Sequence, residues 1–180
     1  MLQLPSSFVN QLAVKLSTPY VASLTLGVGL TGYFFFGNLA VKTQGPLAVL
    51  KTTRAPTVGE VLNAWTWTFN KGKIQFGISK ATASTLFLVA AYTSPNMAMK
   101  TPLLLASALG FSIIGWTLVM MKPINDRLLY LHEAYTKDPL TTTRPEVDSL
   151  VKRWERLHLI RILLSGATHA LGTAVILLSA

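Results

Sequence analysis

The chain lacks cysteine and contains little charge. None of its 180 residues is cysteine, and Asp, Glu, Lys and Arg together make up only 13% of it. The absence of cysteine excludes disulfides, zinc–thiolate sites, iron–sulfur clusters and thiol nucleophiles. A chain that is 51% hydrophobic and so poor in charge is too apolar for an ordinary soluble domain. These two absences indicate a membrane protein that does not use thiol chemistry.

The N-terminal stretch lacks the pattern of a cleaved signal peptide. The segment MLQLPSSFVNQLAVKLSTP has no basic start followed by an apolar core and a small-residue cleavage site. We therefore expect residues 1–19 to form a short lead-in at the membrane interface.

Four apolar runs have the length of membrane-spanning helices. They cover about 20–41, 74–92, 102–121 and 157–179, each near the ~20 residues that cross a ~30 Å hydrocarbon core. The third helix is expected to extend to about 135, and the fourth to cover 150–179. Small residues at four-residue spacing, such as Ala106 and Gly110, permit close helix contacts in lipid. The predicted fold is one all-α domain over residues 1–180, an integral membrane four-helix bundle.

The basic residues outside these runs predict the orientation of the chain. Twelve Lys and Arg lie in the two long connections, 42–73 and 122–156, against only Lys15 and Lys100 on the opposite side. By the positive-inside rule, both long connections are cytoplasmic and both termini are non-cytoplasmic. The net charge of +9 then reflects topology and contact with membrane lipids, not nucleic-acid binding. We expect such an uncleaved multi-span protein in the endoplasmic reticulum membrane.

A pair of tryptophans precedes the second apolar run. Trp65 and Trp67 lie close to Lys71 and Lys73 in the sequence. Tryptophan and lysine are typical of the membrane interface, where they anchor helix ends. We therefore expect both tryptophans to belong to an aromatic belt.

A stripe of polar and small side chains runs along the fourth helix. Successive members are separated by 4, 3, 4, 3 and 4 residues, which predicts one shared face: Trp154, His158, Arg161, Ser165, Thr168 and Gly172. An ionisable group inside a span costs ~2.5–3.5 kcal/mol on insertion scales. Arg161 could avoid this cost by snorkelling to the headgroups. The shared face favours a side chain directed into the bundle.

Polar residues on the other helices are predicted to lie at the depth of this stripe. Lys80 is about two turns inside the second helix, near Gly77 and Ser84, while Asn38 and Asn125 lie toward the cytoplasmic ends of the first and third. Because alternate helices run in opposite directions, all these positions fall in the cytoplasmic half. The sequence predicts one polar pocket for a small hydrophobic aromatic or lipid-like ligand. Snorkelling of Lys80 and capping by Asn125 are the alternatives.

Two short motifs resemble those of a known membrane family. The segment PINDRL at 123–128 resembles the pattern P-x-N-x-x-L, and WERLHLIR at 154–161 resembles W-x-x-x-[HN]-x-x-R. This pair occurs in the four-helix membrane proteins that include the fungal anthrone oxygenases. The size and the layout of four crossings also match, so the resemblance covers essentially the whole chain.

The resemblance implies a reaction. It implies a monooxygenase that oxidises the C10 methylene of a polyketide anthrone to an anthraquinone carbonyl, with molecular oxygen as co-substrate and no flavin, haem or metal. It also implies association with other enzymes of a polyketide pathway. The alternative, from relatives without assigned activity, is a membrane scaffold or carrier that holds a lipid or hydrophobic aromatic metabolite in the same pocket.

Roles for the pocket residues follow as a hypothesis. His158 would act as the base, because histidine titrates near neutral pH, while Arg161 and Lys80 would stabilise the anion that forms. The expected substrate-binding residues share the polar pocket: Asn125, Trp154, Asn38 and Ser165. Among them, Asn125 would hydrogen-bond a carbonyl or peri-hydroxyl, and Trp154 would stack on the planar rings.

Two further features are left open by the sequence. A metal site at the cytoplasmic rim, formed by His132, His158 and Asp126, is an alternative to the cofactor-free mechanism. Residues 43–60, which contain two prolines, are positioned so that they could form a lid over the pocket.

Overall fold

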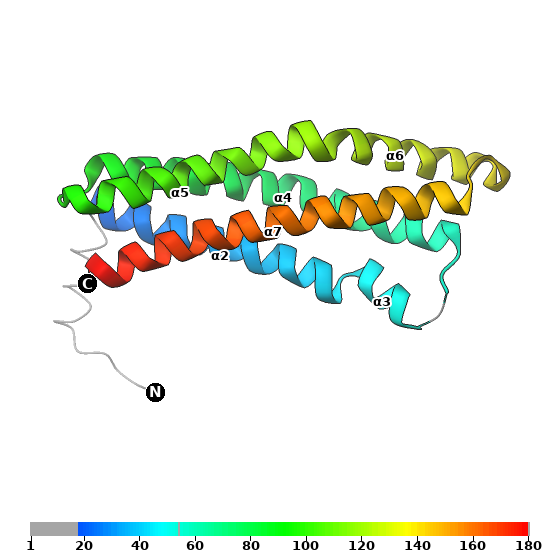
Figure 1. Cartoon of the computed structure of the whole chain (residues 1–180), viewed down its shortest axis with the longest axis horizontal. Coiled ribbons are helices and arrows are strands. Elements are labelled where there is room, and N and C mark those ends of the chain that lie inside the picture. The colour runs from blue at the N-terminus through cyan, green and yellow to red at the C-terminus, as the bar shows by residue number, and fades with distance from the viewer. Residues whose placement is uncertain (1–17, 54, 180) are drawn as a thin grey trace.

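Long helices make up nearly all of the structure. The computed structural model describes residues 18–53 and 55–179, and within these ranges there is no strand (Figure 1). The long helices are α2 (Pro19–Gln44), α4 (Val58–Thr93), α5 (Met97–Trp116) and α7 (Arg144–Ser179). The third continues from α5 through a π-helical turn, η1 (Thr117–Met121), into α6 (Lys122–Lys137). Short elements are α3 (Pro46–Thr53) and the 3-10 turn η2 (Pro139–Thr141).

Four helical units in the described part of the chain are long and apolar enough to cross a membrane. They run alternately up and down, and α2 and α5 each pack against both α4 and α7 (Figure 1). This arrangement confirms the predicted all-α membrane four-helix bundle. The expected lead-in, residues 1–19, lies outside the described residues except for its last two, where Thr18 caps the start of α2.

The two ends of the bundle differ. At one end the hydroxyls of Tyr20 and Ser179 hydrogen-bond at 3.0 Å, which joins the start of α2 to the end of α7. The opposite end carries α3 and α6 (Figure 1), and we call it the distal end. There the helices extend well beyond their most apolar segments.

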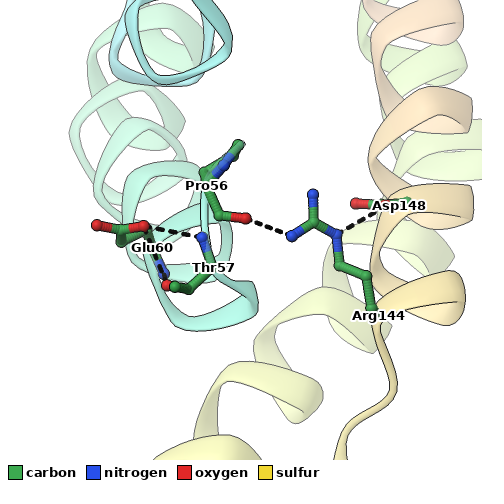
Figure 2. Close-up of polar contacts among 5 residues, drawn as sticks. All are labelled: Pro56, Thr57, Glu60, Arg144 and Asp148. Atoms are coloured by element: carbon green, nitrogen blue, oxygen red, sulfur yellow. Dashed lines mark hydrogen bonds and ion pairs between the residues drawn. The ribbon is translucent and has the colours of Figure 1, made fainter. Parts of the chain in front are cut away.

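The second crossing helix begins earlier than its apolar run indicates. It starts at Val58, not near residue 74, because Thr57 and Glu60 form a capping box. The Thr57 amide donates to Glu60 at 2.8 Å, and the Glu60 amide donates to Thr57 Oγ1 at 3.3 Å (Figure 2). A search for apolar runs alone misses this amphipathic extension of the helix.

Polar contacts join the helices at the distal end. Arg144, at the start of α7, donates from Nη1 to the carbonyl of Pro56 and from Nε to Asp148 at 2.8 Å (Figure 2). Lys51 pairs with Glu155, which holds α3 against α7. The start of α4, the start of α7 and the short α3 are thereby fixed to one another.

The buried apolar residues form two clusters, one at each end of the bundle. Leu24, Phe87, Leu103 and Val175 belong to the cluster near the chain termini. The distal cluster is larger and includes Trp65, Leu62, Met121, Leu128, Val147 and Trp154. Of the polar pocket residues predicted above, Asn38, Lys80, His158 and Arg161 lie between these two clusters in the sequence, whereas Asn125 and Trp154 fall within the distal cluster.

The prediction that Trp65 lies in an aromatic belt is wrong. Its side chain is fully buried, stacks on Phe69 at a ring distance of 5.2 Å and meets Trp154 edge-on at 6.3 Å. Trp67 lies two residues further along, about 200° around the helix from Trp65. Its side chain is 55% exposed, as expected for an interfacial anchor. Sequence position alone does not separate these two faces of α4.

A proline interrupts the third crossing. Pro123 has no backbone N–H to donate along the helix, and the turn before it widens, with the Lys122 amide donating to the Thr117 carbonyl five residues back. This π-helical turn separates α5 from α6. It also changes the direction of the side chains that follow, including Asn125.

Small residues allow close contact between α4 and α5. Ser107 donates to the Ser84 carbonyl at 2.9 Å, and Ser84 faces Gly110 so closely that a Cβ at position 110 would collide with the serine hydroxyl. Gly115, on the same helix, has open space where a Cβ would be. Substitution of Gly110 therefore tests the helix contact, and the same substitution at Gly115 serves as its control.

Gly110→Ala should lower the free energy of unfolding by about 1–3 kcal/mol, because the added methyl overpacks the α4–α5 contact. Gly115→Ala should be neutral or should stabilise the protein by up to about 1 kcal/mol, because alanine favours helix. Thermal unfolding of both variants in the same detergent measures the difference. Equal stabilities would contradict this packing of α4 on α5.

Candidate functional site

A cavity lies between the two apolar clusters. Its volume is about 370 Å³, within the ~300–1,000 Å³ of pockets that bind small molecules. All four crossings contribute to its lining. It brings together six residues predicted from the sequence: Asn38, Lys80, Asn125, Trp154, His158 and Arg161.

Arg161 connects α7 to α2 inside the bundle. Its Nη2 donates both to Asn38 Oδ1 at 2.6 Å and to His158 Nδ1 at 2.9 Å. Its Nε is buried without a hydrogen-bond partner. The guanidinium therefore lies inside the protein and does not snorkel to the bundle surface.

The contacts of His158 assign its tautomer. Nε2 lies 3.3 Å from the backbone carbonyl of Asn38, which can only accept, so Nε2 carries the proton. Nδ1 accepts from Arg161 and is therefore unprotonated. The imidazole is also stacked on Trp154, with ring centres 4.7 Å apart and planes 9° from parallel. These contacts hold a neutral imidazole, 1% exposed, in one orientation.

Asn38 lines the cavity and also hydrogen-bonds to its neighbours. Its Oδ1 accepts from Arg161, its Nδ2 donates to the Phe34 carbonyl at 2.6 Å, and its own carbonyl accepts from His158. All these groups are engaged. Asn38 therefore positions Arg161 and His158, and its contact with a substrate stays a prediction.

Lys80 is the second cation of the cavity. Its side chain is 1% exposed, and Nζ is buried with no hydrogen-bond partner. It lies 5.4 Å from the centre of the Phe34 ring, and the Arg161 guanidinium lies 5.9 Å from the same ring. Cation–π attraction offsets part of the desolvation of both charges.

No carboxylate balances these two cations. Among residues 18–53 and 55–179, no Asp or Glu is buried. Asp126 is the acidic side chain in the cavity lining, but it lies at the exposed rim and pairs with Lys122 at 2.6 Å. The cavity interior is therefore positively charged and suited to an anion.

Asn125 and Trp154 present different surfaces to the cavity. Asn125 Oδ1 is buried without a hydrogen-bond partner, so it is free to accept from a ligand. Trp154 is 6% exposed, and its ring stacks on His158. Trp154 thus holds the imidazole, in addition to contributing to the cavity wall.

Ser165 does not line the cavity, contrary to the prediction that it binds substrate. Its side chain is fully buried, and its hydroxyl donates to the Ile162 carbonyl of its own helix at 2.8 Å. Helical spacing places Ser165 on the correct face, but one turn deeper in the bundle than the cavity. His169, deeper still, packs instead against α2 and contacts Thr31 Oγ1 at 3.3 Å.

The sequence search missed the aromatic wall of the cavity. Phe34, Phe69 and Phe76 all line it. A signal for two of them was present, because Phe69, Lys73, Phe76 and Lys80 are separated by 4, 3 and 4 residues, the same spacing that identified the stripe on α7. Phe34 precedes Asn38 by four residues and so shares its face of α2.

The cavity opens sideways between α4 and the η1–α6 segment. Exposed lining residues occur on both sides of this opening: Lys73 and Gly77 on one, Leu118 and Lys122 on the other. A Cβ at Gly77 would meet nothing within 4 Å, so the backbone borders open space. None of the described residues 43–53 and 55–60 lines the cavity, so α3 does not cover it in this structure.

The alternative metal site is not assembled in the described part of the chain. No group of three His, Asp or Glu side chains in residues 18–53 and 55–179 lies close enough to hold a metal ion. His132 Nε2 instead contacts Asn63 Oδ1 at 2.9 Å, and His158 is engaged by Asn38 and Arg161. The three residues proposed as ligands have separate surroundings.

Comparison with known protein families identifies a match. The model of the family described as anthrone oxygenase matches residues 65–171, more than half of the chain. The matched segment includes Lys80, Asn125, Trp154, His158 and Arg161. No curated protein and no solved structure matches the chain.

The tautomer of His158 can be tested directly. In detergent-solubilised protein with ¹⁵N-labelled histidine, the His158 signals at pH 7 should show a protonated Nε2 and a bare Nδ1, because the carbonyl of Asn38 can only accept. His158→Phe identifies the signals by their loss. An imidazolium signal, or a protonated Nδ1, would contradict the contact with Arg161.

Proposed function

Because the chain belongs to the anthrone oxygenase family, we propose that it is a membrane-bound monooxygenase that oxidises the C10 methylene of a polyketide anthrone to the carbonyl of an anthraquinone. Molecular oxygen is the co-substrate in this proposal, and no flavin, haem or metal takes part. The observation that carries it is a cavity whose interior contains the two cations Lys80 and Arg161, with no buried Asp or Glu among the described residues. Such a cavity favours a ligand that becomes an aromatic anion.

The reaction suits an anion-binding cavity because anthrone is acidic at C10. Loss of a C10 proton gives an anion whose charge is spread onto the carbonyl oxygen on the opposite side of the central ring, as in a phenolate. Transfer of one electron to oxygen, followed by C–O bond formation and protonation, gives a C10 hydroperoxide. Loss of the second C10 proton and cleavage of the O–O bond then yield the carbonyl and one water. One oxygen atom enters the quinone and the other leaves as water.

His158 is the proposed base. Its lone pair, on Nδ1, accepts from Arg161. A substrate oxygen that gains negative charge competes for this guanidinium, whose Nε is unpaired. When Arg161 turns toward that oxygen, Nδ1 becomes free to take the C10 proton. The Nε2–H bond to the Asn38 carbonyl then holds the resulting imidazolium.

Lys80 and Asn125 complete the binding of the substrate. Lys80 has a buried ammonium without a partner, so an oxyanion placed beside it gains a charge-assisted hydrogen bond. The unpaired Oδ1 of Asn125 accepts from a peri-hydroxyl of the substrate. The aromatic side chains Phe34, Phe69 and Phe76 pack on the planar rings.

We also propose how the protein lies in the membrane. Twelve basic residues in the two long connections favour a cytoplasmic distal end with both termini on the far side. As a multi-span protein, it resides in this proposal in the endoplasmic reticulum membrane. The side opening of the cavity is flanked by Lys73 and Lys122, which belong to the interface in this orientation. Polyketide enzymes in the cytoplasm could then supply an anthrone to this opening.

His158→Ala should lower the protein-dependent oxygen uptake with an anthrone by about 10²-fold or more, the usual contribution of a general base. His132→Ala is the matched control, because His132 lies outside the cavity and contacts Asn63. Oxygen consumption by purified protein, minus the rate of anthrone oxidation in empty micelles, measures the effect. Mass spectrometry with ¹⁸O₂ should find one labelled oxygen in the quinone.

The same assay separates the enzyme from the carrier. A carrier retains the anthrone but does not accelerate quinone formation under air, and His158→Ala leaves its behaviour unchanged. Acceleration that requires oxygen and intact His158 supports the monooxygenase. Acceleration that survives in His158→Ala would remove this residue from the mechanism.

A further inference from the structure

A second cavity adjoins the first along the contact between α2 and α4. Its volume is about 380 Å³, and it lies between α4, the end of α2 and the start of α3. Neither the motifs nor the proposed chemistry involves it. Its lining includes the polar side chains Gln44, Lys71 and Gln75, none of which lines the first cavity.

The two cavities share a wall. Four residues line both of them: Val41, Thr68, Gly72 and Phe76. Phe76 carries the one aromatic ring among these four and is partly buried. The other three side chains are small or medium in size, so the Phe76 ring is the main obstacle between the two spaces.

Two glycines leave room for this ring. A Cβ at Gly37 of α2 would lie 2.8 Å from Phe76 Cε1, and a Cβ at Gly72 would lie 3.0 Å from its Cδ2. Any larger residue at these positions would displace the ring. The local sequence of α2 and α4 thus accommodates an aromatic side chain at this point.

The ring also contacts the charged end of the first cavity. Phe76 packs edge-on against Phe34, with ring centres 5.8 Å apart, and its ring is tilted by 52° against that of Tyr33 at 5.9 Å. Phe34 is the ring that faces both Lys80 and Arg161. A ligand whose oxyanion lies between these cations therefore has Phe76 close to one end of its ring system.

We propose that Phe76 determines the length of the ring system that the protein accepts. This inference rests on the proposed function for the class of ligand, a planar oxygenated aromatic. With Phe76 in place, the first cavity holds a three-ring ligand and excludes an additional linear ring. Without the ring of Phe76, the first cavity continues into the second, where Gln44, Lys71 and Gln75 can solvate oxygen substituents on the added ring.

The test compares the binding of two quinones that are not turned over. Anthraquinone is the three-ring probe, and its four-ring linear homologue, naphthacenequinone, is the larger one, each carrying one hydroxyl beside a carbonyl. Phe76→Ala should raise the affinity for the four-ring probe relative to the three-ring probe by on the order of tenfold or more. Phe76→Leu, which keeps apolar packing against Phe34, should shift the ratio in the same direction by less.

Phe69→Leu is the matched control. Phe69 lines the first cavity but not the second, and it stacks on Trp65. Its replacement should weaken the binding of both quinones to a similar extent. Thermal unfolding of each variant checks that the bundle remains folded, and Phe76→Leu retains the test if the alanine variant is unstable.

The outcomes separate this inference from the proposed function. An unchanged affinity ratio in folded Phe76→Leu and Phe76→Ala would overturn the role of Phe76, whether or not the wild-type protein oxidises an anthrone. Shifted affinity with no oxygen uptake would support Phe76 as the length determinant and would contradict the oxygenase. Failure of the wild-type protein to bind either quinone would overturn the ligand class and this inference with it.

Discussion

Two cations buried without a carboxylate are the constraint on which the rest of the site depends. Placing Lys80 and Arg161 inside a membrane bundle costs ~2.5–3.5 kcal/mol for each on insertion scales. The surrounding residues offset part of this cost, since Asn38 and His158 accept from Arg161 and the Phe34 ring faces both charges. The ammonium of Lys80 and the Nε of Arg161 still lack partners. An anionic ligand would satisfy them, and the shape of the cavity restricts that ligand to a small one.

The fold brings these groups together by simple means. Four antiparallel crossings place distant parts of the chain at one depth, and two apolar clusters hold the bundle on either side of the cavity. Close packing of α4 on α5 at Ser84 and Gly110 fixes the helix that carries Lys80. The π-helical turn before Pro123 sets the direction of Asn125. Contacts at the distal end fix the start of α7, about three turns before Trp154 and about four before His158.

Much of the site was predictable from helical spacing and from the order of the crossings. The stripe on α7 identified Trp154 and His158, and the alternation of directions placed Lys80 at their depth. What spacing could not show is how each polar group is satisfied, because that depends on neighbours from other helices. Ser165 lies on the predicted face but is bonded within its own helix. The burial of Trp65 and the cavity beyond Phe76 likewise arise from helix packing, which one sequence does not specify.

The central claim is that Lys80 and Arg161 together stabilise an aromatic oxyanion inside the bundle. The most direct measurement is the pH-dependent absorption spectrum of a bound hydroxyanthraquinone, because its phenolate absorbs at longer wavelength than its phenol. The midpoint of the colour change in the bound dye should lie about one pH unit or more below that in empty micelles, which corresponds to ~1.4 kcal/mol or more of anion stabilisation. Lys80→Met should return the midpoint toward the micelle value. A bound dye that titrates as it does in empty micelles would contradict the account.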